Sequence, residues 1–151
     1  MRILKIIRGT AVDGPGLRNS VYVAGCIHHC PGCHNPESWS FNNGRDMTVD
    51  EVFNELYDDY CDVTLTGGDP ALQWTECLDL CMRLKEHGKN IWMYTGYLYE
   101  DLVVRCPELL KYIDVLVDGR YDANKRDITR FCGSTNQRIL HLKNGEIWRI
   151  E

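Results

Sequence analysis

Three cysteines lie within eight residues of this chain, at Cys26, Cys30 and Cys33, in the spacing CxxxCxxC. Pro31 and Gly32, which lie between the last two, favour an irregular loop over a helix or a strand. Three thiolates this close in sequence can hold one metal centre without a ligand from elsewhere in the chain. We therefore expect the fold to be organised around this loop.

The identity of the metal centre depends on the number of ligands. A structural zinc site has four, commonly cysteine and histidine, and His28, His29 or His34 is close enough in sequence to supply the fourth. A cubane iron–sulfur cluster is normally held by four cysteines, so three would leave one iron open to an outside ligand. The spacing alone does not decide, because CxxC is also a common zinc signal.

Length and charge narrow the classes of protein to which this chain can belong. Its 151 residues predict a single domain over residues 1–151. The net charge of −5, without a long basic run, gives no support for a nucleic-acid partner. No apolar run approaches the ~20 residues of a membrane span, and residues 1–8 are too few and too charged for a signal peptide. We expect a cytoplasmic protein with no membrane partner, whose eight cysteines are reduced thiols and metal ligands rather than disulfides.

Apolar strand-like stretches alternate with stretches of helical period along the chain. Thr48 and Glu51 form a capping box before the most regular helical pattern. Asn144 and Gly145 separate two short alternating runs, which is the strongest short signal for a β-hairpin. We expect strands over residues 2–7, 19–24, 62–66, 90–94 and 113–117, helices over 49–60, 70–87 and 98–105, and a hairpin over 140–148.

Strands that alternate with helices predict an α/β fold with a parallel sheet and right-handed crossovers. Four unusual segments each follow a predicted strand directly, at residues 26–36, 67–70, 95–97 and 118–120. Ligands bind at the carboxyl ends of parallel strands, so we expect these segments to share one rim. A complete eight-stranded barrel takes about 250 residues, which predicts an incomplete (partial) β/α barrel here, open on one side to a segment of another protein.

These motifs together resemble the radical S-adenosylmethionine enzymes, in which CxxxCxxC follows the first barrel strand and Gly-Gly-acid-Pro follows the second. Residues 13–18 (Asp-Gly-Pro-Gly-Leu-Arg) and residues 25–39, which contain Cys-Pro-Gly-Cys-His-Asn, are similar to the activating enzymes of glycyl radical enzymes. The short length and residues 133–138 (Gly-Ser-Thr-Asn-Gln-Arg) resemble the branch that acts on anaerobic ribonucleoside-triphosphate reductases. The resemblance spans nearly the whole chain.

The resemblance implies that Cys26, Cys30 and Cys33 are the three ligands of one [4Fe-4S] cluster. The fourth iron would be chelated by the amino and carboxylate groups of S-adenosyl-L-methionine. No catalytic side chain beyond the cluster and this cofactor is implied. The cofactor contacts implied along the rim are Gly32, Cys33, His34, Gly67, Gly68, Asp69, Asp118 and Arg120.

The reaction implied is that of a radical S-adenosylmethionine oxidoreductase. A low-potential donor such as flavodoxin or ferredoxin reduces the cluster, and the cofactor is cleaved to methionine and a 5′-deoxyadenosyl radical. That radical takes a hydrogen from one glycine in the large glycyl radical subunit of the anaerobic ribonucleotide reductase. The alternative within the family is an activator of another glycyl radical enzyme, of the formate-lyase type. Outside the family, a zinc-stabilised interaction module and an electron-carrying iron–sulfur protein stay open.

Two positions depart from the family pattern. Asp69 stands where many relatives have glutamate, and Gly32 occupies a position that is aromatic in many of these enzymes. Once a cluster is accepted, we expect His28 and His29 at the loop surface. The cysteines outside the motif are expected to be packing residues or, for the last of them, a loop residue without a role: Cys61, Cys77, Cys81, Cys106 and Cys132.

Overall fold

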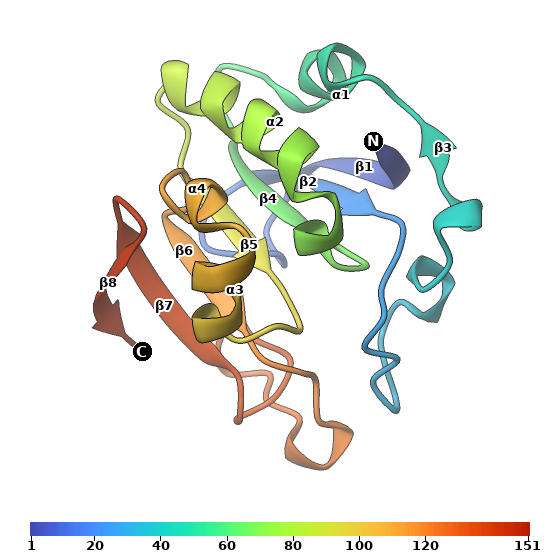
Figure 1. Ribbon diagram of the computed structural model, residues 1–151, viewed down its shortest axis with the longest axis vertical. Coiled ribbons are helices and arrows are strands. Elements are labelled where there is room, and N and C mark those ends of the chain that lie inside the picture. Colours follow the sequence, from blue (N-terminus) through green and yellow to red (C-terminus); the bar gives the residue numbers. More distant parts are fainter.

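The computed structural model describes all of residues 1–151 and arranges eight strands in one open sheet, in the order β3-β1-β2-β4-β5-β6-β7-β8 (Figure 1). The strands are β1 (Arg2–Thr10), β2 (Arg18–Val23), β3 (Arg45–Asp46), β4 (Asp62–Gly67), β5 (Ile91–Tyr94), β6 (Val115–Asp118), β7 (Arg138–Lys143) and β8 (Glu146–Ile150). The α-helices are α1 (Val49–Leu56), α2 (Trp74–Glu86), α3 (Tyr99–Arg105) and α4 (Pro107–Leu110).

The expected α/β fold is confirmed, and the sheet is mixed rather than wholly parallel. Strands β2, β4, β5 and β6 are parallel neighbours, joined by helical crossovers. Strand β1 is antiparallel to β2, because only a short Gly-Pro turn joins them and a parallel pair needs a long crossover. The hairpin of β7 and β8 adds two further antiparallel strands to the other edge. The sheet does not close, so the expected open side is present.

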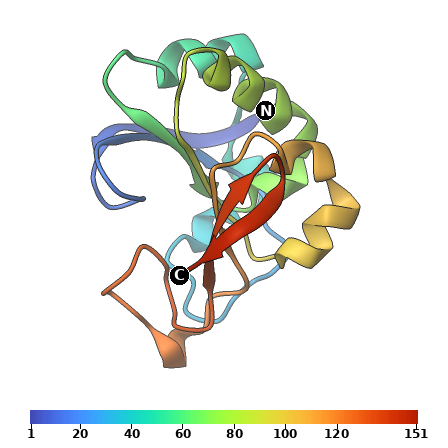
Figure 2. The same ribbon diagram turned by 90° about the vertical axis from the view of Figure 1, so that its left-hand side faces the viewer.

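The two faces of the sheet differ in what covers them. Side chains such as Val21, Leu65 and Met93 lie on one face and pack with the helices into a core of 23 buried residues. Their neighbours Tyr22, Thr66 and Tyr94 line a cavity on the other face. Figure 1 shows α2, α3 and α4 in front of the sheet, and Figure 2 shows the orange segment around residue 125 on the helix-free side. None of the four α-helices is both long and apolar enough to cross a membrane.

Two helix boundaries differ from the sequence-based expectation. The helix expected over 49–60 ends at Leu56, because the Asp58 carboxylate accepts hydrogen bonds from the amides of Tyr60 and Cys61 (2.8 and 2.7 Å) and forms a turn. The helix expected from residue 70 begins with a 3-10 turn over Pro70–Gln73 before α2.

Two local predictions are confirmed in detail. The capping box of Thr48 and Glu51 is present, with both reciprocal hydrogen bonds at 3.1 Å. The turn between β7 and β8 has positive φ at both Asn144 (51°) and Gly145 (81°). That is the type I′ geometry, whose twist matches that of the flanking strands.

The buried Arg18 side chain joins the amino ends of three parallel strands. Its guanidinium donates to Thr64 Oγ1 (2.8 Å) and to the Val63 carbonyl (2.8 Å) of β4, and to the carbonyl (3.1 Å) and amide oxygen (2.9 Å) of Asn90 before β5. A Cβ on Gly14 would lie 2.8 Å from the Arg18 side chain, so the first glycine of residues 13–18 is needed for packing. Gly14 and Arg18 of residues 13–18 therefore stabilise the sheet.

We predict that Arg18→Met lowers the free energy of unfolding by about 3 kcal/mol, because several buried oxygens lose their donor. Chemical denaturation of the reduced, metal-free protein measures this change. Arg8 is the control, since its side chain is 54% exposed and lies 3.4 Å from Asp58 on the surface. Arg8→Met should change the free energy by no more than about 0.5 kcal/mol. Equal effects of the two substitutions would contradict the role given to Arg18.

We propose that residues 1–151 form one cooperative domain, because a single sheet runs through both halves of the chain. Unfolding followed by tryptophan fluorescence and by far-ultraviolet circular dichroism should then give coincident transitions. The four tryptophans are spread over the chain, at Trp39, Trp74, Trp92 and Trp148. Two separated transitions would show that the antiparallel edge unfolds independently of the parallel strands.

Candidate metal centre

The segment that carries the three cysteines leaves β2 at the carboxyl edge of the sheet, and we call residues 25–39 the cysteine loop. Its two ends are joined by backbone hydrogen bonds, from Gly25 to Ser38 (2.6 Å) and from Cys26 to Trp39 (3.1 Å). The Asp69 amide after β4 donates to the Gly25 carbonyl (2.8 Å). The loop is therefore fixed at its base beside residues 67–70, as the sequence predicts for parallel neighbours.

The two glycines at the end of β4, Gly67 and Gly68, permit this close approach. A Cβ on Gly67 would lie 2.4 Å from the Val23 amide nitrogen, and one on Gly68 would lie 2.3 Å from the Gly25 carbonyl oxygen. A side chain at Gly67 would push β2 away from β4, and one at Gly68 would push away the base of the cysteine loop. The Gly68 carbonyl accepts no hydrogen bond within the chain and lies half-buried at this edge. It is an available acceptor next to the cysteines.

The three cysteines of the motif are free thiols and half-buried. Burial raises the pKa of the Cys26 thiol, while the backbone amides of His28 and then His29 lower it. The Asn35 amide lies 3.4 Å from Cys33 Sγ, and the Cys33 amide donates to the Cys30 carbonyl (3.0 Å). No three side chains of His, Cys, Asp or Glu are gathered into one metal-binding group.

The residues of the loop fit an iron–sulfur cluster in their chemistry. All three motif ligands are soft thiolate donors, which suit both iron–sulfur clusters and zinc. Amide N–H groups directed at Cys26 and Cys33 sulfur would stabilise the negative charge of metal-bound thiolates. His29, which was one candidate for a fourth zinc ligand, stacks on Trp39 (4.5 Å between ring centroids) within the loop.

The prediction that His28 lies at the loop surface is wrong. Its side chain is 3% exposed, and its Nε2 lies 2.7 Å from Oδ2 of the fully buried Asp69. The ring meets the edge of Tyr97 at 4.6 Å and packs on Gly96, where a Cβ would fall 2.4 Å from His28 Cδ2. No periodic pattern in the sequence marks this contact, since it joins two loops.

The Asp69 carboxylate is the centre of this rim. Besides His28, it accepts from the Ala71 amide (3.0 Å), the Thr95 hydroxyl (2.9 and 3.0 Å) and the Gly96 amide (3.0 Å). These donors come from the cysteine loop, from the turn after β4 and from the turn after β5. The expected convergence of these three segments is thereby confirmed.

The fourth segment, after β6, holds its two candidate residues in different ways. The Asp118 carboxylate is fully buried and accepts from the Tyr99 amide (2.8 Å) and from Arg138 Nε (3.0 Å). Asp118 and then Glu100 raise the pKa of the Arg138 guanidinium by hydrogen bonding. Arg120 is exposed and lines a second cavity, of about 670 Å³, with His28 and Tyr97.

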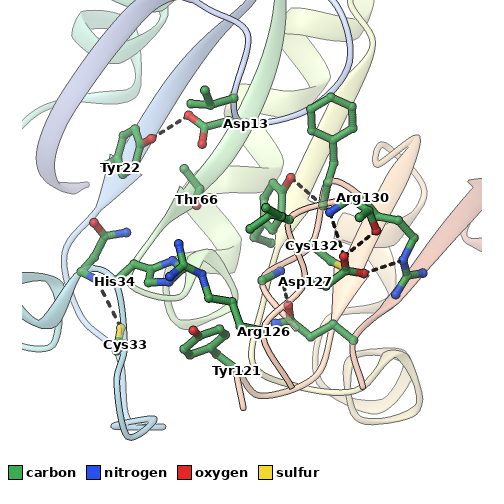
Figure 3. A pocket seen from close by; sticks show the side chains of 18 of the residues that line it. Asp13, Tyr22, Cys33, His34, Thr66, Tyr121, Arg126, Asp127, Arg130 and Cys132 are labelled. Carbon is green, nitrogen blue, oxygen red and sulfur yellow. Dashed lines mark hydrogen bonds and ion pairs between the residues drawn. The ribbon is translucent and has the colours of Figure 1, made fainter. Parts of the chain in front are cut away.

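A larger cavity of about 820 Å³ opens beside the cysteine loop on the helix-free face of the sheet. Figure 3 shows Cys33 and His34 on one side of it, Asp127 and Cys132 on the other, and Arg126 between them. Segment 121–133 forms one wall of this cavity. There the Tyr121 ring lies against the His34 ring, with 4.8 Å between the ring centroids.

Gly32 lies beneath this segment, with φ at 74° and its notional Cβ 3.0 Å from the Ala123 Cβ. Gly32 is exposed, with Tyr121 and Ala123 against one side of it. The sequence alone did not identify Tyr121, since it lies in a stretch without periodicity; its aromatic side chain directly after the fourth rim segment was the only signal.

The cysteines outside the loop are buried. Cys77, Cys81 and Cys106 belong to the main core, and Cys61 is 7% exposed, which confirms their expected packing role. Burial raises the pKa of Cys77 to about 12 and that of Cys106 to about 11, so these thiols are not activated. Cys132, expected to be a loop residue without a role, instead packs with Val117 and Ile139.

Comparison with known proteins agrees with this geometry. A family model described as a 4Fe-4S single cluster domain matches residues 12–140. The anaerobic ribonucleoside-triphosphate reductase-activating protein of Enterobacteria phage T4 is 38% identical, over 91% of this chain and 92% of its own length. Proteins of that name from Escherichia coli K12 (36% identical; 87% and 93%) and Haemophilus influenzae (35%; 95% and 99%) are similar throughout. The chain therefore belongs to the family of anaerobic ribonucleoside-triphosphate reductase-activating proteins.

Proposed function

We propose that this chain activates an anaerobic ribonucleoside-triphosphate reductase as a radical S-adenosylmethionine enzyme. The single observation that carries the proposal is the position of CxxxCxxC, on a loop at the carboxyl edge of four parallel strands and beside a large cavity. The names of the relatives give the target of activation. The four parallel strands and the open side support a partial barrel of the radical S-adenosylmethionine type.

Cys26, Cys30 and Cys33 hold a single [4Fe-4S] cluster in this proposal, and S-adenosylmethionine completes the coordination of the fourth iron. When bound and reduced, the cluster supplies the electron that splits the cofactor into methionine and a 5′-deoxyadenosyl radical. A low-potential protein such as flavodoxin or ferredoxin supplies that electron. The chain itself positions the cofactor and excludes water.

The methionine end of the cofactor lies along Gly67, Gly68 and Asp69. The free carbonyl of Gly68 is the acceptor best placed for the ammonium group, because the Asp69 carboxylate already has four donors within the chain. Gly32, Cys33 and His34 contact the cofactor from the cysteine loop. At the far end of the rim, Arg120 is the residue with an exposed side chain, whereas Asp118 acts by holding Arg138.

The partner is the large subunit of the reductase, and it reaches the cofactor through the open side of the sheet. Three apolar side chains that line the large cavity are exposed, Val12 (76%), Ile128 (84%) and Phe131 (37%). Exposed apolar side chains around a cavity indicate a surface that a protein covers. A glycine is a suitable target there, since without a Cβ its α-hydrogen is accessible.

The test of this function starts with anaerobically reconstituted, reduced protein. Its electron paramagnetic resonance spectrum should show a [4Fe-4S] signal that shifts when S-adenosylmethionine is added, and 5′-deoxyadenosine should form. Adding the reductase should give a glycyl radical signal, whereas adding a formate-lyase enzyme should not. Protein that binds zinc and no iron after reconstitution would overturn the proposal in favour of a zinc-stabilised interaction module.

We predict that Cys30→Ala abolishes cluster assembly and cofactor cleavage together, because two cysteines cannot hold the cluster. Iron and sulfide analysis and a 5′-deoxyadenosine assay measure the two losses. Cys61→Ala is the matched control, since Cys61 is buried outside the loop and should leave the iron content unchanged. Full cleavage activity in Cys30→Ala would refute the cluster assignment.

We predict that Ile128→Glu separates the two halves of the reaction. A charge on the rim of the large cavity should slow glycyl radical formation on the reductase by about tenfold or more, because apolar contacts with the partner are lost. Formation of 5′-deoxyadenosine without the reductase should not change. Ile150→Glu is the control, because Ile150 is also an exposed isoleucine (58%) but lies on β8 and lines neither cavity. The same loss in both variants would argue against docking at this rim.

A further inference from the structure

The Asp69 carboxylate has no free capacity for a ligand. A carboxylate offers roughly four acceptor positions on its two oxygens. Four groups of the chain already donate to it, namely His28 Nε2, the Ala71 amide, the Thr95 hydroxyl and the Gly96 amide, all between 2.7 and 3.0 Å. The side chain is also fully buried. The Asp69 carboxylate therefore binds groups of the protein itself and not a ligand.

His28 is the point at which this carboxylate reaches the cysteines. Between Ile27 and His34, the His28 side chain makes the only hydrogen bond that leaves the cysteine loop. The base of the loop is fixed by its backbone, but the stretch that carries Cys30 and Cys33 has no other polar connection to the sheet. The His28 ring is in addition enclosed by Gly96 and Tyr97 from the turn after β5.

The geometry points to a latch, formed by Asp69 and His28, that holds the cysteine-bearing part of the loop against the ends of β4 and β5. This inference rests on the proposed function for the identity of the metal centre, and it makes His28 a positioning residue of that centre. Asp69 positions His28 and does not bind the cofactor with its carboxylate. The backbone carbonyl of Gly68 is then the group that contacts the cofactor ammonium.

The latch also accounts for an aspartate at position 69. One oxygen of the short side chain accepts from the Ala71 amide two residues on, while the other accepts from His28. An additional methylene group would move the carboxylate away from its own backbone and into the space that the His28 ring occupies. Aspartate in place of glutamate at position 69 therefore goes together with His28, two residues after the first cysteine.

The first experiment uses the reduced, metal-free protein and amide hydrogen exchange, so it does not depend on enzyme activity. We expect His28→Asn to speed exchange of the Cys33 and Asn35 amides, the two hydrogen-bonded amides of this stretch, by about tenfold or more, because a hydrogen bond to a charged group is lost. His29→Asn is the matched control, since His29 has no hydrogen bond that leaves the loop, and it should exchange like the wild type. His28→Gln retains a donor to the carboxylate and should restore slow exchange.

A second variant tests the latch with His28 in place. Gly96→Ala puts a methyl group where the ring lies, 2.4 Å from His28 Cδ2, and should displace the ring from Asp69. Exchange in the same loop should rise as in His28→Asn, while amides of β4 stay protected in all variants. Wild-type exchange in both His28→Asn and Gly96→Ala would overturn the latch, as would equal loosening by His29→Asn.

The reconstituted protein supplies the second readout. The shift of the electron paramagnetic resonance signal on addition of S-adenosylmethionine should change in His28→Asn, return in His28→Gln and be unaltered in His29→Asn. An unaltered signal in His28→Asn would overturn the positioning role. A wild type that binds zinc without iron would refute the proposed function, while the exchange pattern would still decide whether the latch exists.

Discussion

A buried carboxylate joins the segments that form the functional edge of this protein. Asp69 lies at the end of β4 and accepts hydrogen bonds from the cysteine loop and from the turn after β5. A buried charge is costly unless every acceptor position is satisfied, so the four donors and the carboxylate stabilise one another. Loss of any one donor would leave a buried charge partly unsatisfied. The rim can therefore be rigid without metal, although it consists almost wholly of loops.

The two faces of the sheet have different roles: one forms the core and the other borders the proposed site. One face carries the main core and the helices, and Arg18 joins the strands at their amino ends. The other face carries few apolar side chains and the large cavity, at the edge where the cysteines lie. Such an arrangement leaves the site open to a protein partner, because none of the four α-helices lies on that face (Figure 2). It also explains why segment 121–133, whose only regular element is a 3-10 turn over Ala123–Lys125, is well placed to contact both the loop and a partner.

The order of strands and helices could be predicted because each element has a local signal. The β7–β8 turn followed from Asn144 and Gly145, and the start of α1 followed from Thr48 and Glu51. The end of α1 could not be predicted from apolar spacing, since the Asp58 side chain competes for the backbone amides. The antiparallel pairing of β1 with β2 and of β7 with β6 was not predicted, because an alternation of strands and helices describes only the middle of this chain.

The sequence by itself determined the three cysteines that we propose as ligands and the edge of the sheet where they lie. Both depend on short spacing: three cysteines within eight residues, and polar or glycine-rich segments directly after strands. Only the tertiary structure decided which of these residues remain free to bind a ligand. His28 and Asp69 are 41 residues apart, and their contact depends on the packing of two loops around Gly96. Because such contacts arise from the relative position of strand ends, no local pattern encodes them, and an apparent ligand residue such as Asp69 can turn out to be fully engaged within the protein.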